Sequence, residues 1–376
     1  MGQTKEYPHG IPECGADALR FGLLAYTKQG RDINLDTQRV VSYRHFCNKL
    51  WNATKLLLSY LPEGFRVAKS IRDTEAWVAS PEGRASLAIR DRWILSRLRH
   101  AVEAVNSSLA EFKFADACEA MYNFWLHDLC DVYLELTKAV VRGDDVAAKD
   151  QTLQVLIYCY ETGLRLLHPV MPFVTEELWH RMPTRGMAWS ATEADPPSVM
   201  VAPFPLPIEG TDDQDAERMV ASCMRAVKAA RVIRSKLNMK AKVRTHLFVR
   251  CDEAVGGDFA AMAEDICQLA GGESLGVIGM DAAAPRGCLP EVVDATATIL
   301  SQVQGAVDAK AEAARMQKQV KKKIESLTKM EKRMSTDKYR TKTPEEIREK
   351  DAASIAEQKE EIARVHESIE QMLALE

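Results

Sequence analysis

The chain has 376 residues, of which 46% are hydrophobic and 28% charged, and its formal net charge at pH 7 is −4. This composition supports packed cores in two or three domains and excludes a globally disordered chain. The small net charge argues against a protein uniformly covered by nucleic acid.

The cysteine pattern and the hydropathy pattern both indicate a cytoplasmic protein. Nine cysteines occur without a C-x-x-C pair, which is typical of reduced thiols and not of a disulfide framework or a zinc site. No apolar run approaches the roughly 18 residues that cross a bilayer, and the N-terminus lacks a signal-peptide pattern. We therefore expect a cytoplasmic location and no membrane partner.

The first 42 residues are too few to form a domain of their own. Residues 7–15, YPHGIPECG, are rich in turn formers, and residues 16–26 have the apolar spacing of a helix. Arg31 is a candidate contact to a polyanion, although a solvated surface charge is the simpler interpretation.

Residues 43–58 have the spacing of a helix with two different faces. Apolar residues recur at steps of three and four on one face, namely Tyr43, Phe46, Cys47, Leu50, Thr54, Leu57 and Leu58. Hydrogen-bonding and cationic residues follow the same steps beside them, namely Arg44, His45, Asn48, Lys49 and Asn52. A core helix with a solvated back explains this pattern, and so does a helix that presents a binding face.

Residues 43–183 as a whole predict an antiparallel helical bundle. Helical spacing extends over 91–112, 116–141 and 153–167, and Pro172 begins a shorter helix at its first turn. The spacing places Phe112 on the inward side of the first of these helices. The stop signals are Gly143 and the pair His168-Pro169.

Residues 184–297 predict a linker followed by a small α/β unit. Prolines and acidic residues fill the stretch up to Asp215, and a helix (216–237), a strand (243–250), a helix (259–270) and a strand (275–280) follow. The first helix carries four cations at three-residue steps, and no acid occurs between Glu217 and Asp252. This basic face is either a phosphate-contacting surface or a solvated helix face, and it consists of Arg225, Lys228, Arg231 and Arg234.

Residues 298–376 predict an antiparallel coiled-coil hairpin. Apolar residues repeat at steps of three and four from Ile299 to Met334 and again from Ile355 to Met372. Between them, residues 343–346, TPEE, form a helix-start signal. Residues 310–342 hold twelve Lys and Arg against four Asp and Glu, so one arm is cationic. Its candidate phosphate contacts are Lys318, Lys321, Lys322, Lys323, Arg340 and Lys342; a coiled coil for a protein partner is the alternative.

Several segments resemble the class I valyl-tRNA synthetase family. Residues 30–36 and 44–53, GRDINLD and RHFCNKLWNA, are similar to the junction between the catalytic half and the helical anticodon-binding domain of that family. Residues 7–21 resemble the segment after its KMSKS loop. Residues 130–138, CDVYLELTK, and 171–179, MPFVTEELW, resemble segments shared by the isoleucyl, leucyl and valyl synthetases. The resemblance covers essentially the whole chain and implies the C-terminal portion of such an enzyme.

The implied fold is mainly α: a helical anticodon-binding bundle, a small α/β connector and a C-terminal coiled-coil hairpin. The implied partner is tRNA, valine-specific by resemblance, contacted at its anticodon and its elbow. Proteins commonly read unpaired bases by stacking them on aromatic rings. The bundle residues that we select as candidates for this role are Arg92, Trp93, Phe112, Lys113, Phe114 and Tyr122. A place in the core is the alternative for Phe112 and Phe114, and we favour the core for Phe112.

The motifs of aminoacylation do not occur in these 376 residues. The HIGH and KMSKS signatures are both missing, and KMEK at 329–332 lies within a heptad pattern. We therefore expect no catalytic residue and no cofactor here; ATP with Mg and valine would bind catalytic domains that, like the editing domain, this chain lacks. Glu176, Glu177 and His180 have the one-turn spacing of a metal site, but an amphipathic helix explains them better, and we expect no metal.

Two alternatives remain open at this stage. In one, another chain supplies the catalytic half of a full enzyme; in the other, the chain is a free-standing RNA- or protein-binding module with no role in aminoacylation. The sequence does not decide the oligomeric state, the origin of the truncation, or membership in a larger synthetase or elongation-factor assembly.

Overall fold

The computed structural model describes residues 10, 12–28, 36–62, 65, 70–186, 189–190 and 192–304, and beyond them residues 317–318, 320–321, 324, 327–328, 332, 334, 355 and 359. The chain folds as two compact units, Met1–Val220 and Ala221–Glu376. Each unit is considered by itself below.

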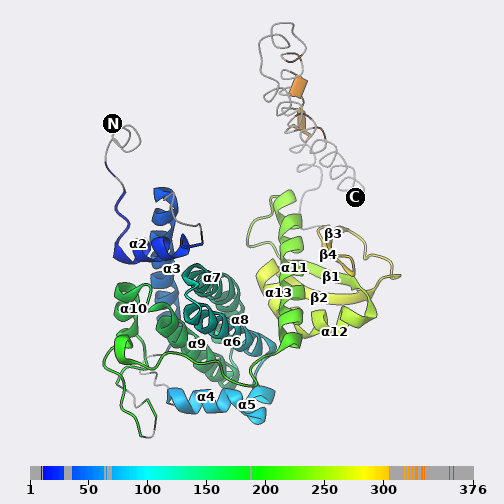
Figure 1. Cartoon of the computed structure of the whole chain (residues 1–376). Coiled ribbons are helices and arrows are strands. Elements are labelled where there is room, and N and C mark those ends of the chain that lie inside the picture. The colour runs from blue at the N-terminus through cyan, green and yellow to red at the C-terminus, as the bar shows by residue number, and fades with distance from the viewer. Residues whose placement is uncertain are drawn as a thin grey trace. The chain divides into compact units, whose positions relative to one another are not determined.

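The first unit is built from helices (Figure 1). Its elements are α2 (Ala16–Ala25), α3 (Thr37–Tyr60), α4 (Ile71–Ala79), α5 (Pro81–Ser86), α6 (Ile89–Ala110), α7 (Phe114–Asn123), the π-helix η1 (Phe124–Tyr133), α8 (Leu134–Arg142), α9 (Val146–Leu167), α10 (Pro172–Trp179) and the short 3₁₀ helix η2 (Val199–Val201). α6 packs on α7, η1 and α9, and α3 packs on α2, η1 and α9. The predicted helical bundle is therefore confirmed.

The helix boundaries follow local signals in the sequence. The carboxylate of Asp36 accepts a hydrogen bond from the backbone N–H of Gln38 at 2.9 Å and caps α3. Asp145 caps α9 in the same way, and α9 ends at Leu167, two residues before Pro169, as predicted. The helices α4 and α5, each capped by a serine, were not anticipated.

The expected continuous helix over 116–141 is divided into α7, η1 and α8. The middle ten residues form a π-helix, whose wider turn changes which side chains face inward. Trp125, Leu129 and Tyr133, at four-residue steps, are buried, whereas Val132 is half-buried. The aromatic core next to α9 thus depends on this wider turn.

Asp17 joins the N-terminal helix α2 to the bundle. Its two carboxylate oxygens accept hydrogen bonds from the backbone N–H groups of Phe173, at 3.2 Å, and Val174, at 2.7 Å, in the first turn of α10. A negative group is favourable at a helix N-terminus, where backbone donors lack partners. Asp17 is almost fully buried, so this contact fixes α2 against α10.

The second unit is an α/β fold (Figure 1). Its elements are most of α11 (Gln214–Lys236), β1 (Thr245–Cys251), α12 (Glu253–Ala261), α13 (Ala263–Ala270), β2 (Gly272–Gly279), β3 (Cys288–Asp294) and β4 (Ala297–Gln302). The strand order is β2-β1-β4-β3; β1 and β2 are parallel, and the other neighbours are antiparallel. α12 and α13 form the crossover that a parallel pair requires.

The sheet confirms part of the sequence prediction and corrects another part. Thr245, Leu247 and Val249 are buried on one face of β1, as the alternation predicted. Ile299, however, pairs with Val249 within β4, so it does not begin the coiled coil. Residues 298–302 thus belong to β4, and residues 303–304 are not helical either. The rest of the predicted hairpin lies outside the described residues, apart from isolated helical positions between 317 and 359.

Among the described helices, none combines the length and the apolar character that crossing a membrane would require.

Candidate nucleic-acid interface

The polar stripe predicted on α3 lies on its exposed side, beside a buried apolar stripe. Arg44 donates a hydrogen bond through Nη1 to the backbone carbonyl of Glu13 at 2.6 Å. His45, Asn48 and Asn52 are exposed and form no hydrogen bond to a described residue. These three side chains therefore present donors and acceptors from a helix that the core holds in place.

Lys49, on the same helix, forms an ion pair. Its Nζ lies 2.9 Å from Asp131 Oδ1 in η1, and both side chains are more than two-fifths exposed. The hydrogen bond to Asp131 raises the pKa of Lys49. An exposed pair of this kind adds little stability, but it reduces the charge that Lys49 offers to a polyanion.

One side of α6 holds the extended segment 203–213 against the bundle. Arg92 Nη1 lies 3.4 Å from Asp213 Oδ2, and Ser96 Oγ accepts a hydrogen bond from the backbone N–H of Asp213 at 3.0 Å. Other α6 side chains that contact this segment are Arg99, His100 and Asn106. Arg92, a predicted anticodon contact, is thus engaged within the unit.

Trp93 and Tyr122 lie in packed surroundings. Trp93 is 6% exposed, so its ring is not available to stack on a base in this conformation. The Tyr122 ring centroid lies 4.9 Å from that of Phe46, and burial raises the pKa of its hydroxyl. Both residues support the bundle, and we exclude Trp93 from the surface proposed below.

The turn between α6 and α7 differs from the sequence prediction. Phe112, which the helical spacing assigned to the core, is 78% exposed, because α6 ends at Ala110. Lys113 is exposed as well, and its Nζ lies 2.6 Å from Glu111 Oε2. Phe114 is half-buried, with its ring centroid 6.3 Å from that of Phe112.

The basic face of α11 is mostly used inside the second unit. Arg225 Nε lies 3.0 Å from Asp294 Oδ2. The other two arginines donate to backbone carbonyls: Arg231 to that of Leu269 at 3.1 Å, and Arg234 to those of Gly271 at 3.3 Å and Lys240 at 3.0 Å. Lys228 is exposed and has no hydrogen bond or ion pair to a described residue.

Comparison with known proteins shows which family the residues of this region resemble. Residues 91–249, from α6 to β1, match the family model described as the anticodon-binding domain of tRNA ligase. Residues 91–249 are therefore similar to the anticodon-binding domain of tRNA ligase. Valine–tRNA ligase of Mus musculus is 40% identical over 98% of this chain, and that of Homo sapiens gives the same values. The mitochondrial valine–tRNA ligase 1 of Arabidopsis thaliana is 37% identical over 94%.

The chain spans about 28% of the length of the mouse and human relatives. Among solved structures, a chain in the ternary LeuRS-tRNA-LeuAMS complex of Agrobacterium radiobacter K84 matches 54% of this chain and 21% of its own length. The TM-score of that match is 0.37 and the sequence identity is 21%.

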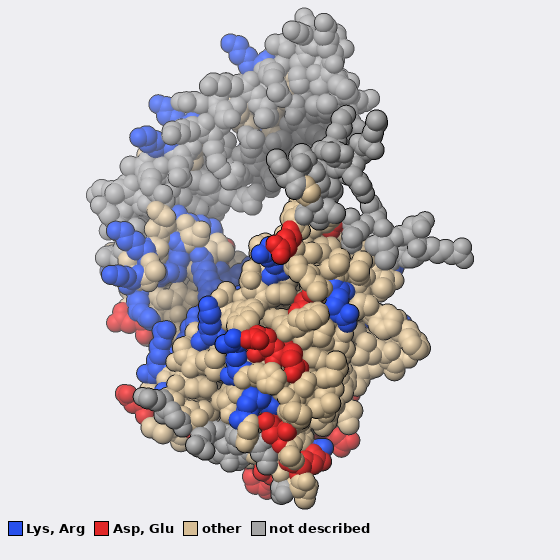
Figure 2. All heavy atoms as spheres, turned by 90° about the vertical axis from the view of Figure 1, so that its left-hand side faces the viewer, with Lys and Arg blue, Asp and Glu red and all other residues tan. Residues whose placement is uncertain are grey.

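The matched anticodon-binding domain includes the α6–α7 turn and the four cations of α11, whereas the polar stripe of α3 precedes it. Of the cations predicted on the C-terminal arm, Lys318 and Lys321 are exposed and helical. Arg31, Lys322, Lys323, Arg340 and Lys342 lie outside the described residues. On the face drawn in Figure 2, acidic side chains lie among the basic ones, so the surface drawn in colour is not uniformly cationic.

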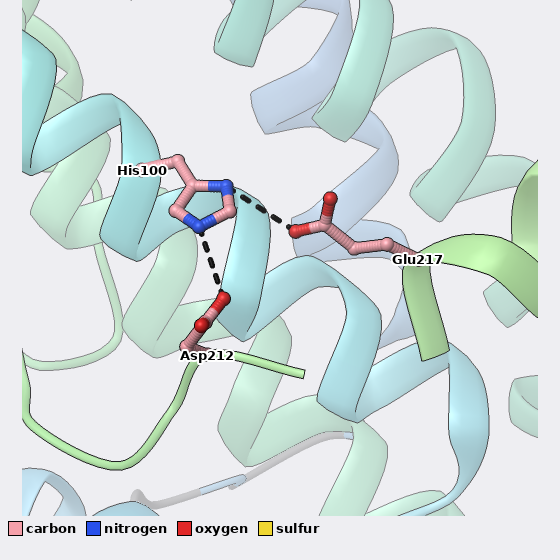
Figure 3. A group of neighbouring side chains, drawn as sticks. All are labelled: His100, Asp212 and Glu217. Carbon is pink, nitrogen blue, oxygen red and sulfur yellow. Dashed lines mark hydrogen bonds and ion pairs between the residues drawn. The ribbon is translucent and has the colours of Figure 1, made fainter. Parts of the chain in front are cut away.

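His100 lies between two carboxylates in the anticodon-binding domain (Figure 3). Its Nε2 is 3.1 Å from Asp212 Oδ1 and its Nδ1 is 3.3 Å from Glu217 Oε1. In the part of the chain that the structure describes, this is the one cluster of three potential metal ligands. Each ring nitrogen faces a different carboxylate, and Glu217 also accepts a hydrogen bond from Ser96 at 2.7 Å. We therefore interpret the cluster as a hydrogen-bonded link between α6 and the first turn of α11.

The His180 and Glu176 pair, with the one-turn spacing of a metal site, has a structural role too. His180 Nε2 lies 2.9 Å from Glu176 Oε1, and Glu176 Oε2 accepts hydrogen bonds from the Ser198 hydroxyl, at 2.9 Å, and the Val199 N–H, at 3.2 Å. The carboxylate thereby anchors η2 to α10.

Proposed function

We propose that this chain binds transfer RNA as the C-terminal portion of a valine–tRNA ligase. The observation that carries the proposal is the match of residues 91–249 to the anticodon-binding model, within a chain 40% identical to mouse valine–tRNA ligase over 98% of its length. Joined to catalytic and editing domains, it would serve the ATP-dependent attachment of valine to its tRNA in the cytoplasm. ATP with Mg and valine would bind those other domains.

The exposed stripe on α3 supports a contact with unpaired nucleotides. His45, Asn48 and Asn52 present an imidazole and two amides that have no hydrogen bond to a described residue. Amide and imidazole groups hydrogen-bond the edges of unpaired bases and the sugar–phosphate backbone. The buried residues Phe46 and Leu50 hold the helix in place, so these groups lose little conformational freedom on binding.

A filter-binding titration of the chain with valine tRNA and with a second tRNA, repeated over a range of salt, tests the proposal. We expect valine tRNA to bind more tightly, with an affinity that falls steeply as salt rises, because phosphate contacts release counterions. Equal and negligible affinity for both tRNAs at low salt would overturn the proposal and favour a module for a protein partner.

The α3 contact has its own test. Replacing Asn48 and Asn52 together by alanine removes two amides without changing the charge, so we expect weaker tRNA binding, by about tenfold, with the same salt slope. Ser59→Ala is the matched control, because Ser59 is an exposed polar residue of the same helix that bonds locally to Leu56. If the double variant binds like the control, α3 is not part of the interface.

The C-terminal arm is proposed as the contact to the tRNA elbow on the sequence pattern alone. Lys321 is exposed, whereas Lys322 and Lys323 lie outside the described residues. Changing all three to glutamate should flatten the salt slope while the helical circular dichroism stays unchanged. An unchanged slope would remove these lysines from the interface.

A further inference from the structure

The end of α6 has a backbone conformation that is unusual for the residue in it. The N–H of Lys113 donates to the carbonyl of Ser108 at 2.8 Å and the N–H of Phe112 to that of Leu109 at 3.1 Å. These two bonds form a Schellman motif, which places Phe112 in the left-handed region with φ +58°. Glycine is the usual residue there because a Cβ atom is unfavourable in this conformation.

Two other helix ends have, at the position with positive φ, a residue that commonly adopts this conformation. Gly271 follows α13 with φ +71°, and Asn238 lies just after α11 with φ +47°. Glycine and asparagine adopt this conformation at little cost. Among the described residues, Phe112 and Asn238 are the non-glycine residues with positive φ, and Phe112 is the bulky one.

Packing of the side chain does not explain why a phenylalanine occupies position 112. Its side chain is 78% exposed, so burial of the ring does not offset the backbone cost. The ring meets that of Phe114 edge-on, with an interplanar angle of 77°. Residues held in an unfavourable backbone conformation are concentrated at functional sites. The strained conformation of Phe112 therefore indicates a functional role for this residue.

The surroundings of the ring indicate the kind of ligand. Lys113 is paired with Glu111 in the same turn, so the turn offers little net charge to a polyanion. Because the charged residues Glu111 and Lys113 flank Phe112, this turn is also a poor fit for a broad apolar surface of a protein partner. An exposed aromatic face whose charged neighbours pair with each other suits stacking on a nucleobase, because every base has a π-face.

We propose that Phe112 stacks on an unpaired base of the tRNA anticodon loop and that Phe114 supports its edge. This inference rests on the proposed function, and Phe112 lies within the matched anticodon-binding region. The ring supplies affinity through stacking, while cationic residues elsewhere supply the salt-dependent part.

The variant Phe112→Gly gives two effects of opposite sign. It relieves the backbone, so the unfolding temperature should rise by about 2–4 °C. It removes the stacking ring, so the affinity for valine tRNA should fall by roughly tenfold. Because no charge is lost, plots of log affinity against log salt should shift in parallel for the variant and the parent chain.

Two further variants make the result specific. Phe112→Trp keeps a stacking ring and should retain the affinity. Phe173→Ala removes another exposed phenylalanine of the same unit, 67% exposed in α10, and should leave both affinity and salt slope unchanged. Valine tRNA carrying 2-aminopurine at one anticodon-loop position at a time reports the base directly: one position should change fluorescence with the parent chain and with Phe112→Trp, but not with Phe112→Gly.

The outcomes separate the two proposals. If the parent chain binds no tRNA, the proposed function fails. If the parent chain binds and Phe112→Gly binds equally tightly, or if no loop position shows a fluorescence change that requires the ring, the stacking role is overturned while the function stands.

Discussion

Trp125 donates its indole Nε1–H to the backbone carbonyl of Gly163 at 3.1 Å, and its ring occupies the space where a side chain on residue 163 would lie. A Cβ atom there would approach Trp125 Cζ2 to 2.8 Å. Both residues are buried between η1 and α9. We therefore expect Gly163→Ala to lower the free energy of unfolding by about 1–3 kcal/mol, measured by urea titration.

Gly257→Ala is the matched control for this prediction. Gly257 lies in α12, and a Cβ atom on it would meet nothing within 4 Å. Alanine favours the helix over glycine, so this change should stabilise the chain by roughly 0.5–1 kcal/mol. Equal effects of the two substitutions would contradict the packing described for Trp125.

Asp17 provides a test of the contact between α2 and α10. Its carboxylate accepts the N–H groups of Phe173 and Val174, so Asp17→Ala leaves two helix-terminal donors without this partner. We expect a loss of about 2 kcal/mol in the free energy of unfolding. Asp17→Asn keeps one acceptor oxygen and should lose less; if neither variant changes stability, the contact does not hold α2.

Glu161 gives the stability of the bundle a specific pH dependence. The side chain is fully buried in α9, and neither carboxylate oxygen accepts a hydrogen bond. Burial raises the pKa of Glu161 from 4.5 to about 7, which outweighs the opposing effect of Arg165 and Arg185. The folded state therefore binds this proton more tightly than the unfolded state does.

The stabilisation from that proton is complete below pH 4.5 and is lost as the pH rises through 7. Relative to Glu161→Gln, the parent chain should lose up to roughly 3 kcal/mol of stability between pH 4.5 and pH 8. The measurement is urea unfolding of both chains at several pH values. A difference that stays constant, or changes in favour of the parent chain as pH rises, would contradict a buried carboxyl whose loss of solvation outweighs its ion pair with Arg185.

The cations of α11 differ in role: Arg231 forms a hydrogen bond within the fold, whereas Lys228 is exposed to solvent. Arg231→Gln removes a hydrogen bond to the carbonyl of Leu269 and should cost about 1 kcal/mol of stability. Lys228→Gln should change stability by less than about 0.5 kcal/mol. If Lys228 contacts a phosphate, that variant should reduce the salt slope of tRNA binding by a little less than one. An unchanged slope would assign Lys228 to the solvated face.

The sequence predicted the long elements because their signals are local. The stop before Pro169 and the recurrence of Leu247 and Val249 on one face of a strand each depend on neighbouring residues, and each is present in the structure. Ile299 misled the prediction because its four-residue step to Val303 places two side chains on one side of a strand as well as on one side of a helix. A strand depends on its partners elsewhere in the chain, here β1 and β3 on either side of β4, and a single segment does not reveal them.

Phe112 and Arg92 show what spacing alone misses in the candidate site. The apolar spacing of α6 continues through Phe112 in the sequence, although the helix ends in a Schellman turn before it. Spacing alone does not show where a helix ends. The charged neighbours Glu111 and Lys113 were the available signal that the core had ended. Arg92 was selected for its charge, but its pairing with Asp213 depends on a segment more than a hundred positions away, which no local pattern predicts.

An anticodon transplant tests the central claim most directly. A non-valine tRNA that receives the anticodon loop of valine tRNA is compared with its unmodified parent by filter binding to this chain at fixed salt. The proposed role predicts that the transplant tightens binding by tenfold or more and that Phe112→Gly removes most of the gain. Equal affinity for the transplanted and unmodified tRNAs would contradict anticodon recognition by this chain.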